Sequence, residues 1–342
     1  MKSLVRLLII VFALQFTLDV YAGGGNRTGT GGATQLQIPV GPRGIAMGEA
    51  NIATSHGVEA LFWNPAGVAR ISSSADVMFS HMSYIADIGV EYGAVAANFE
   101  GFGVIALSLK SLAIGDIPVT TTHDPDGTGA TFAPQMLTAG LTYARQLTDR
   151  ISVGITTNIV METLGEVNST GVAFNVGVMY ETLGDIEGLN LGIAMKNVGP
   201  QMQYDGSGLM SLASASDLQR PPSYLKVEAA SFDLPSSFEM GLGYKMNLGE
   251  VNALQFSGAY QTNNYSGDEY KLGAEYGYNK MFFARVGYQG APQVSSENYL
   301  YGITAGAGIH YDLGGIAVTV DYAYRDAKYF NGNHVFALSL GF

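Results

Sequence analysis

The strict alternation of the last nine residues is the feature that most constrains how this chain can fold. From His334 to Phe342, the large side chains Phe336, Leu338, Leu340 and Phe342 take one parity and small side chains take the other. This pattern predicts a terminal β-strand with an apolar face and a small-residue face. An exposed apolar edge strand would aggregate. A closed barrel in a membrane avoids this, because the last strand pairs with the first and the apolar face meets lipid.

The same alternation recurs along the chain, and charged residues fall on the small, polar parity. Arg or Lys on a lipid-facing parity would cost roughly 2 to 4 kcal/mol near the bilayer midplane. A soluble antiparallel sandwich also alternates, but it explains less well why Tyr and Phe gather near the strand ends. We therefore predict an all-β, transmembrane outer-membrane β-barrel of about fourteen antiparallel strands. The expected strands are 75–86, 88–99, 102–114, 135–148, 150–163, 170–182, 187–197, 235–247, 251–262, 268–278, 280–289, 299–313, 315–325 and 333–342.

Composition supports a membrane barrel. The chain is 47% hydrophobic but only 13% charged, against about 25% charged in an ordinary soluble domain. A helical membrane protein would need runs of about 20 apolar residues, and polar or Gly residues interrupt every stretch after the N-terminus. The net charge of −12 argues against a nucleic-acid partner.

The N-terminus is typical of an exported protein. Lys2 and Arg6 precede an apolar stretch and a small-residue cleavage site at 20–22, so we predict a signal peptide over residues 1–22. A Gly-rich flexible leader over 23–38 is expected to follow. The chain has no cysteine, which excludes a disulfide and a lipidated N-terminus.

Residues 39–72 do not alternate, and they precede the barrel that we expect over 73–342. Asn64 suits the N-cap of a short helix that begins at Pro65. An apolar cluster accompanies this helix, consisting of Val58, Leu61, Phe62 and Trp63. We interpret 39–72 as a hatch that folds into the barrel lumen.

Two connections are long, at 123–134 and 199–234, whereas most others are tight. Outer-membrane barrels keep periplasmic turns short and place long loops outside, but strand parity alone leaves the face of 199–234 open. This connection is unusually rich in apolar and aromatic residues for a solvated loop, and aromatic anchors often dominate interfaces. Its candidate partner-binding residues are Tyr204, Leu209, Met210 and Tyr224.

We find no pattern that predicts catalysis, a cofactor or a metal ion. The five histidines lie in separate predicted elements without ligand-like spacing. The Gly-rich stretches match neither a phosphate-binding loop nor a dinucleotide fingerprint, and there is no nucleophile elbow. The sequence therefore favours a barrel that is not an enzyme.

Four segments resemble the PorV/PorQ family, which is similar to the FadL long-chain fatty-acid transporters. They are GPRGIAMGEANIATSHGVEALFWNPAGVA (41–69), FSHMSYIADIGVEYGAVA (79–96), LTYARQLTDRISVGI (141–155) and NVGPQMQYDGSGL (197–209). The shared element of the two families is Asn64-Pro65-Ala66. The resemblance implies a FadL-type barrel with an N-terminal hatch in the bacterial outer membrane. It also implies a place in type IX secretion. There the protein would bind the C-terminal signal domain of each cargo protein, take the cargo from the translocon and deliver it to the attachment complex at the cell surface.

Two functions remain open at this point: a type IX secretion component that binds or shuttles cargo, and a FadL-like passive transporter of hydrophobic small molecules. Fold alone cannot choose between them. The lumen-facing parity is rich in Gly, Ala, Thr, Asn, Glu and Lys, whereas a fatty-acid pocket is mostly apolar, so the first is favoured. A terminal Phe342 also resembles the signal by which the barrel assembly machinery recognises its substrates.

Overall fold

The computed structural model describes residues 29, 31–213, 222–295 and 298–342. The predicted signal peptide and most of 23–30 lie outside the described residues. No helix in the described part of the chain is long and apolar enough to cross a membrane.

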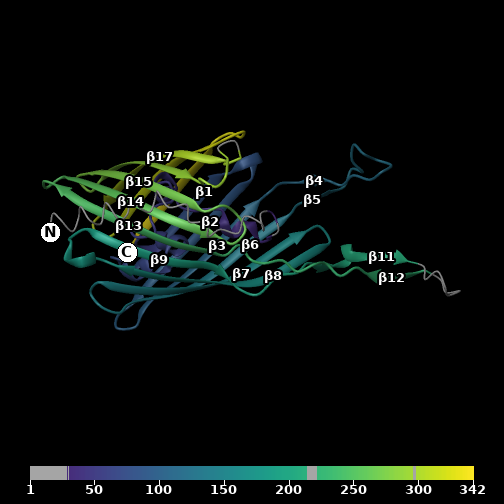
Figure 1. Cartoon of the computed structure of the whole chain (residues 1–342), viewed down its shortest axis with the longest axis horizontal. Helices are drawn as coiled ribbons and strands as arrows, with labels where there is room; N and C mark the ends of the chain where they lie inside the picture. The colour runs from purple at the N-terminus through teal and green to yellow at the C-terminus, as the bar shows by residue number, and fades with distance from the viewer. Residues whose placement is uncertain (1–28, 30, 214–221, 296–297) are drawn as a thin grey trace.

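Fourteen antiparallel strands form a closed barrel (Figure 1). Strands that follow one another in the barrel pair with each other, and the last pairs with the first. No strand edge is therefore left unpaired in lipid. This confirms the predicted fold class, and every predicted strand end lies within three residues of the observed one. In order, the strands are β1 (Ala75–Ser83), β2 (Gly89–Phe99), β3 (Gly103–Ala113), β6 (Gln135–Gln146), β7 (Ile151–Leu164), β8 (Val167–Tyr180), β9 (Leu189–Val198), β13 (Ser237–Leu248), β14 (Asn252–Asn263), β15 (Glu269–Tyr278), β16 (Phe282–Gly290), β17 (Tyr301–Asp312), β18 (Ala317–Ala327) and β19 (Asn333–Gly341).

The residue after β19 completes the closure. The backbone amide of Phe342 donates to the carbonyl oxygen of Ala75 at 2.8 Å, and the Phe342 carbonyl accepts from the amide of Ser74 at 2.6 Å. Its side chain shares the outward parity of Phe336 and Leu338, both of which are exposed on the barrel wall. The alternation of the terminal segment thus sets which face meets lipid.

The connections differ in length between the two ends of the barrel. One end, here called the turn end, has only short links: 100–102, 147–150, 181–188 (with η6, Leu183–Asp185), 249–251, 279–281 and 313–316. The other end, the loop end, carries both long connections (Figure 1). Because short turns face the periplasm in outer-membrane barrels, the loop end is the external one. This resolves the face of 199–234.

Two small two-stranded ribbons project beyond the barrel at the loop end, one in the connection from β3 to β6 (114–134) and one in the connection from β9 to β13 (199–236) (Figure 1). The first pairs β4 (Ile117–Pro118) with β5 (Thr131–Phe132), and the second pairs β11 (Met210–Ala213) with β12 (Ser223–Lys226). We call the β11–β12 pair the external ribbon. The other loop-end elements are η5 (Ile85–Asp87), β10 (Asp205–Gly206), which pairs with β8, and η7 (Ser207–Leu209).

The hatch residues fold as short helices inside the barrel, where Val58 and Leu61 belong to one apolar cluster and Trp63 to a second. Phe62 packs against both, so the predicted single cluster is in fact shared between two. The predicted flexible leader is wrong at its described end, since Leu36 is buried there. The elements are η2 (Thr34–Gln37), α2 (Pro42–Ala46), η3 (Gly57–Glu59), α3 (Ala60–Trp63) and η4 (Pro65–Arg70).

Candidate functional site

Glycines on the lumen face of the strands form the seat of the hatch. A Cβ atom on Gly287 would lie 2.0 Å from the amide nitrogen of Gly48, and one on Gly273 would lie 2.4 Å from the Met47 carbonyl oxygen. Real Cβ atoms do not approach backbone this closely, so only glycine allows these contacts. The small lumen-facing parity therefore reflects hatch packing. Gly154 and Gly192 meet the hatch backbone in the same way, and a Cβ atom on Gly177 would lie 2.0 Å from the side-chain oxygen of Asn64.

Asn64 anchors the middle of the hatch, and its side chain is fully buried. Its Oδ1 accepts from the amide of Ala66 at 3.1 Å, so it caps η4, which begins at Pro65 as predicted. Its Nδ2 donates to the carbonyls of Ile52 at 2.9 Å and Val178 at 3.2 Å. One side chain thus joins two hatch segments to strand β8, which gives the Asn-Pro-Ala element a structural role beyond the cap.

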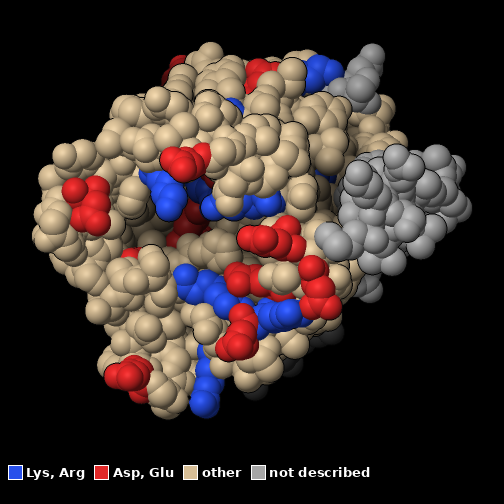
Figure 2. All heavy atoms as spheres, turned by 90° about the vertical axis from the view of Figure 1, so that its left-hand side faces the viewer, with Lys and Arg blue, Asp and Glu red and all other residues tan. Residues whose placement is uncertain are grey.

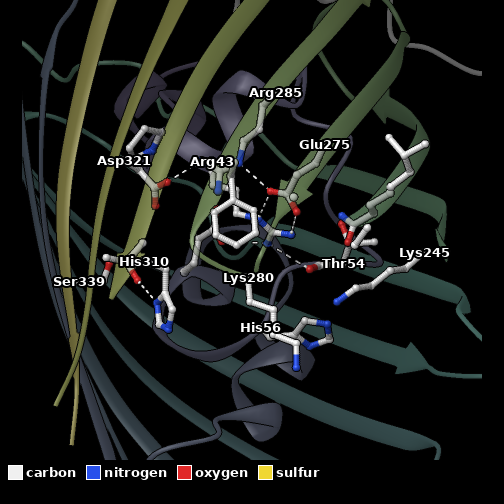
Figure 3. Close-up of a pocket in the computed structure, with 18 of the residues that line it drawn as sticks. Arg43, Thr54, His56, Lys245, Glu275, Lys280, Arg285, His310, Asp321 and Ser339 are labelled. Atoms are coloured by element: carbon white, nitrogen blue, oxygen red, sulfur yellow. Dashed lines mark hydrogen bonds and ion pairs between the residues drawn. The ribbon is translucent and has the colours of Figure 1, made fainter. Parts of the chain in front are cut away.

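An ionic cluster holds the hatch at the turn end (Figure 3). Arg43 donates to both carboxylate oxygens of Glu275, from Nε at 2.8 Å and from Nη2 at 3.2 Å, and it pairs with Glu59 at 3.2 Å. Arg285 bonds the same Glu275 at 2.6 Å and Asp321 at 2.5 Å. Bidentate Arg–carboxylate pairs fix geometry as well as charge. We call this group the turn-end latch.

A second ionic cluster holds the hatch nearer the loop end. Glu49 pairs with Arg325 at 2.9 Å and with Lys271 at 3.3 Å. Burial alone would raise the pKa of Glu49, but the positive charges of Lys271 and Arg325 hold it below its usual value. Glu49 is therefore ionised at neutral pH. Lys110 adds a bond from Nζ to the Ile38 carbonyl at 3.0 Å.

Charged side chains on the lumen face of the strands pair partly with one another and partly with the hatch. Lys196 and Glu239 do pair between neighbouring strands, at 2.6 Å. The other pairs mostly involve hatch residues that sequence reasoning did not single out, namely Arg43, Glu49 and Glu59.

The hatch lies between two cavities that share no lining residue. The turn-end cavity has a volume of about 720 Å³, and Figure 2 shows the molecule from this end with a hollow surrounded by charged side chains. The loop-end cavity has a volume of about 500 Å³. Its lining combines apolar side chains, among them Ile38, Phe62 and Met136, with the charged side chains of Glu239 and Arg325. Separate sets of described residues therefore line the two cavities.

The four predicted partner-binding residues do not behave alike. Tyr204 is engaged within the molecule, because its hydroxyl donates to Glu162 at 2.6 Å and its ring packs on Phe232. Leu209 is partly covered. Met210 and Tyr224 are 54% and 74% exposed on the external ribbon. Of the four, only these two are more than half exposed.

The histidines lie apart in the structure as well. His81 contacts Glu91, His310 contacts Thr319 and His334 contacts Tyr322. Within the described ranges, no three His, Asp or Glu side chains are grouped so as to hold a metal ion.

Comparison with known proteins agrees with this architecture. Three solved structures share the fold, each covering 89% of this chain and 98% of its own. They are the CymD monoaromatic hydrocarbon channel (14% identical, TM-score 0.54), the Ralstonia pickettii toluene transporter TbuX (14%, 0.54) and the Pseudomonas putida toluene transporter TodX (12%, 0.55). At these identities the likeness shows the fold alone.

No curated protein sequence matches the chain significantly. The family model described as type IX secretion system protein PorV matches residues 23–218, which is more than half of the 342 residues. The family and the fold are those of a secretion or transport barrel in the bacterial outer membrane. This chain therefore belongs to the PorV family of type IX secretion outer-membrane proteins.

Proposed function

We propose that this barrel binds secreted cargo or the translocon at the external face of the outer membrane, through its long connections and above all through the external ribbon. The observation that carries this proposal is the exposed apolar face of the ribbon. Met210, Leu212 and Tyr224 are each more than half exposed, and Leu212 lies directly opposite Tyr224. Contiguous exposed apolar side chains mark interaction sites.

The ribbon also has unpaired strand edges. Among the described residues, β11 pairs only with β12, so each strand keeps one edge free. An isolated two-stranded ribbon is marginally stable by itself, and a free edge accepts an added strand from a partner. A β-rich cargo domain or a translocon strand supplies that chemistry.

The hatch supports a role outside the lumen. Ionic and glycine contacts hold it across the barrel between the two cavities. In this proposal the Asn64-Pro65-Ala66 element keeps the lumen closed while the external connections bind cargo or the translocon. A folded cargo domain then travels with the barrel and not through it.

Photo-crosslinking tests the proposal. A photoreactive residue at Tyr224 should capture, in native membranes, exported proteins with a shared C-terminal β-domain or a large translocon barrel. The matched control is Leu313, which is 62% exposed in a turn at the opposite end. Equal capture of the same proteins from both positions, or capture of none of them from Tyr224, contradicts the proposal.

A second candidate is passive transport of a hydrophobic small molecule. It is favoured by the apolar residues that line the loop-end cavity, among them Ile38, Phe62 and Met136. The charged residues of the same lining, Glu239 and Arg325, are unfavourable for a hydrocarbon. Saturable binding of a hydrophobic compound that Phe62→Ala abolishes, with no crosslinked protein partner, would reverse our ranking.

We further propose that Phe342 is an assembly signal for the barrel assembly machinery. Its backbone closes the barrel, and its side chain is about half exposed on the lipid-facing parity. Phe342→Asp should lower the outer-membrane yield of heat-modifiable protein far more than Phe330→Asp in a loop-end connection. A normal yield of Phe342→Asp removes this role.

A further inference from the structure

One edge of the external ribbon presents backbone groups at two defined residues. The amide of Val227 donates to the carbonyl oxygen of Leu209 at 2.8 Å, one residue pair before the ribbon begins. Hydrogen-bonded and non-hydrogen-bonded pairs alternate along antiparallel strands, so Met210 and Leu212 both fall at non-hydrogen-bonded positions opposite β12. The N–H and C=O groups of these two residues therefore point outward along the free edge of β11.

This free edge lies on the side of strand β8. The chain that leads into β11 has a neighbour on each side, because β10 pairs with β8 while Leu209 bonds Val227. On the β8 side, the amide of Gly208 donates to the carbonyl oxygen of Glu166 at 3.4 Å. Strand β8 begins at Val167, so this neighbour ends where β11 begins. The edge of β11 thus extends beyond the tip of the β7–β8 hairpin (Figure 1).

The outer edge of β12 is protected against an added strand, whereas that of β11 is not. Lys226 lies at an edge position of β12, and Pro222 directly precedes β12 at the same parity, where it has no amide to donate. Charged residues, above all Lys, and Pro are common means by which edge strands avoid further pairing. Strand β11 has the sequence Met-Ser-Leu-Ala and contains neither. The ribbon is therefore open to strand addition at β11.

The surroundings of this edge define the chemistry of the strand that fits it. Met210 and Leu212 share one face of the ribbon with Tyr224, so an added strand would gain most by placing apolar side chains on that face. At the barrel end of the edge lies the exposed side chain of Glu166, whose carboxylate accepts from the Ser207 hydroxyl at 3.2 Å. A Lys or Arg at that end of the added strand would be attracted to this carboxylate.

We propose that the edge of β11 pairs with an edge strand of an exported, water-soluble β-domain, with apolar side chains on one face and a Lys or Arg next to Glu166. This inference rests on the proposed function and names its partner. Strands of a closed membrane barrel are paired along both edges, as they are in this chain, so the wall of a translocon barrel has no strand to add. The ribbon projects beyond the barrel, where a water-soluble domain can reach it (Figure 1).

Proline at an edge position tests this pairing. Leu212→Pro and Leu212→Ala both shorten the side chain, but only proline removes the outward amide, and it breaks no bond to β12. With a photoreactive residue at Tyr224 in native membranes, Leu212→Pro should capture exported β-domain proteins about tenfold less than Leu212→Ala. Lys226→Pro and Lys226→Ala, at the edge of β12, are the matched control pair and should capture these proteins equally.

Charge reversal tests the chemistry of the added strand. Glu166→Lys should lower capture of the same proteins about threefold. Glu228→Lys makes an equal change of charge at an exposed position after β12 and should leave capture unchanged. Equal capture by these two variants would remove the Lys or Arg from the proposal.

The outcomes separate this inference from the proposed function. If Leu212→Pro does not assemble into a heat-modifiable barrel, Met210→Pro against Met210→Ala gives the same readout. Equal capture by the proline and alanine variants, or a loss that affects only a translocon barrel, overturns pairing at β11 and leaves the proposed function in place. Capture of neither class of protein by the chain without these substitutions overturns both.

Discussion

The hatch and the external ribbon differ in whether their side chains find partners within the molecule. The hatch places charged side chains in an enclosed lumen, and each is bonded: Arg43 to Glu275 and Glu59, and Glu49 to Lys271 and Arg325. The ribbon places apolar side chains outside the barrel, and no described residue covers them. The charges of the hatch are paired within the described part of the chain, whereas the ribbon's apolar side chains are those that we propose a partner covers.

This difference suggests separate roles: the hatch closes the lumen, and the ribbon binds a partner in the function that we propose. A buried ion pair specifies one arrangement, because removing either member leaves an uncompensated charge. An exposed apolar face specifies no internal arrangement and gains free energy only when another molecule covers it. We therefore expect hatch variants to change the stability and permeability of the barrel. Ribbon variants should change partner binding alone.

The largest expected effect follows from removing the turn-end latch. Arg43→Ala leaves Glu59 without its bonded cation and removes one of two guanidinium groups from Glu275. Breaking a buried pair of this kind typically costs about 3 to 5 kcal/mol. We expect a lower midpoint in denaturant unfolding of the reconstituted barrel and increased conductance in planar bilayers.

The control for this change is Arg150→Ala, because Arg150 forms an ion pair with Asp185 that is exposed at the barrel rim. It should leave both unfolding and conductance nearly unchanged. Equal effects of the two variants would mean that the hatch does not depend on the latch.

The next effect comes from filling the glycine seat. Gly287→Ala would place a Cβ atom 2.0 Å from the Gly48 amide nitrogen, against backbone that has no flexible end to move. Overpacking of this kind costs about 1 to 3 kcal/mol, and we expect proteolytic cleavage within 39–72 to become faster. Gly302→Ala, on β17, is the matched control, since nothing lies within 4 Å of its added Cβ. Equal proteolysis of the two variants would show that the hatch does not rest on this glycine.

Loss of the Asn64 side chain should have a smaller effect. Asn64→Ala removes the cap of η4 and the bonds to Ile52 and Val178. Loss of a cap alone typically costs about 1 kcal/mol. We expect slightly faster cleavage of the hatch with the barrel intact, measured beside Asn247→Ala at the turn end. If protease sensitivity and conductance both stay at wild-type values, Asn64 does not hold the hatch.

Local pattern made the barrel predictable, and long-range contact made the site hard to predict. Strand parity repeats every two residues, so a short window reveals which face of β19 meets lipid. The latch joins Arg43 to Glu275, which lie 232 residues apart in the chain. No local spacing connects them. A usable signal was nevertheless present, because a charged residue in a segment expected to enter the lumen needs a partner there.

Two other differences have the same physical origin. The small, polar parity predicts a lumen-facing side, but it does not reveal that several of its glycines receive the hatch backbone at distances that exclude a Cβ atom. Residue type and loop position predict Tyr204 as a partner-binding residue, and the fold shows in addition that its hydroxyl donates to Glu162 on β7. Composition indicates that a loop is rich in apolar and aromatic residues, whereas only the fold decides which of these side chains remain exposed.

The smallest effect on stability, and the sharpest test of the comparison, belongs to the external ribbon. Leu212→Ser combined with Tyr224→Ser removes one facing apolar pair from the exposed side. Surface changes away from packed features usually alter stability by less than about 0.5 kcal/mol, so unfolding and conductance should match wild type. Capture of exported proteins or of the translocon by photo-crosslinking from Met210 should nevertheless be lost. Leu225→Ser, which lies opposite Ser211 on the other side of the ribbon, is the matched control and should retain capture. If the double variant retains capture, or if it opens the lumen as Arg43→Ala is expected to do, the division between a closed interior and a binding exterior is wrong.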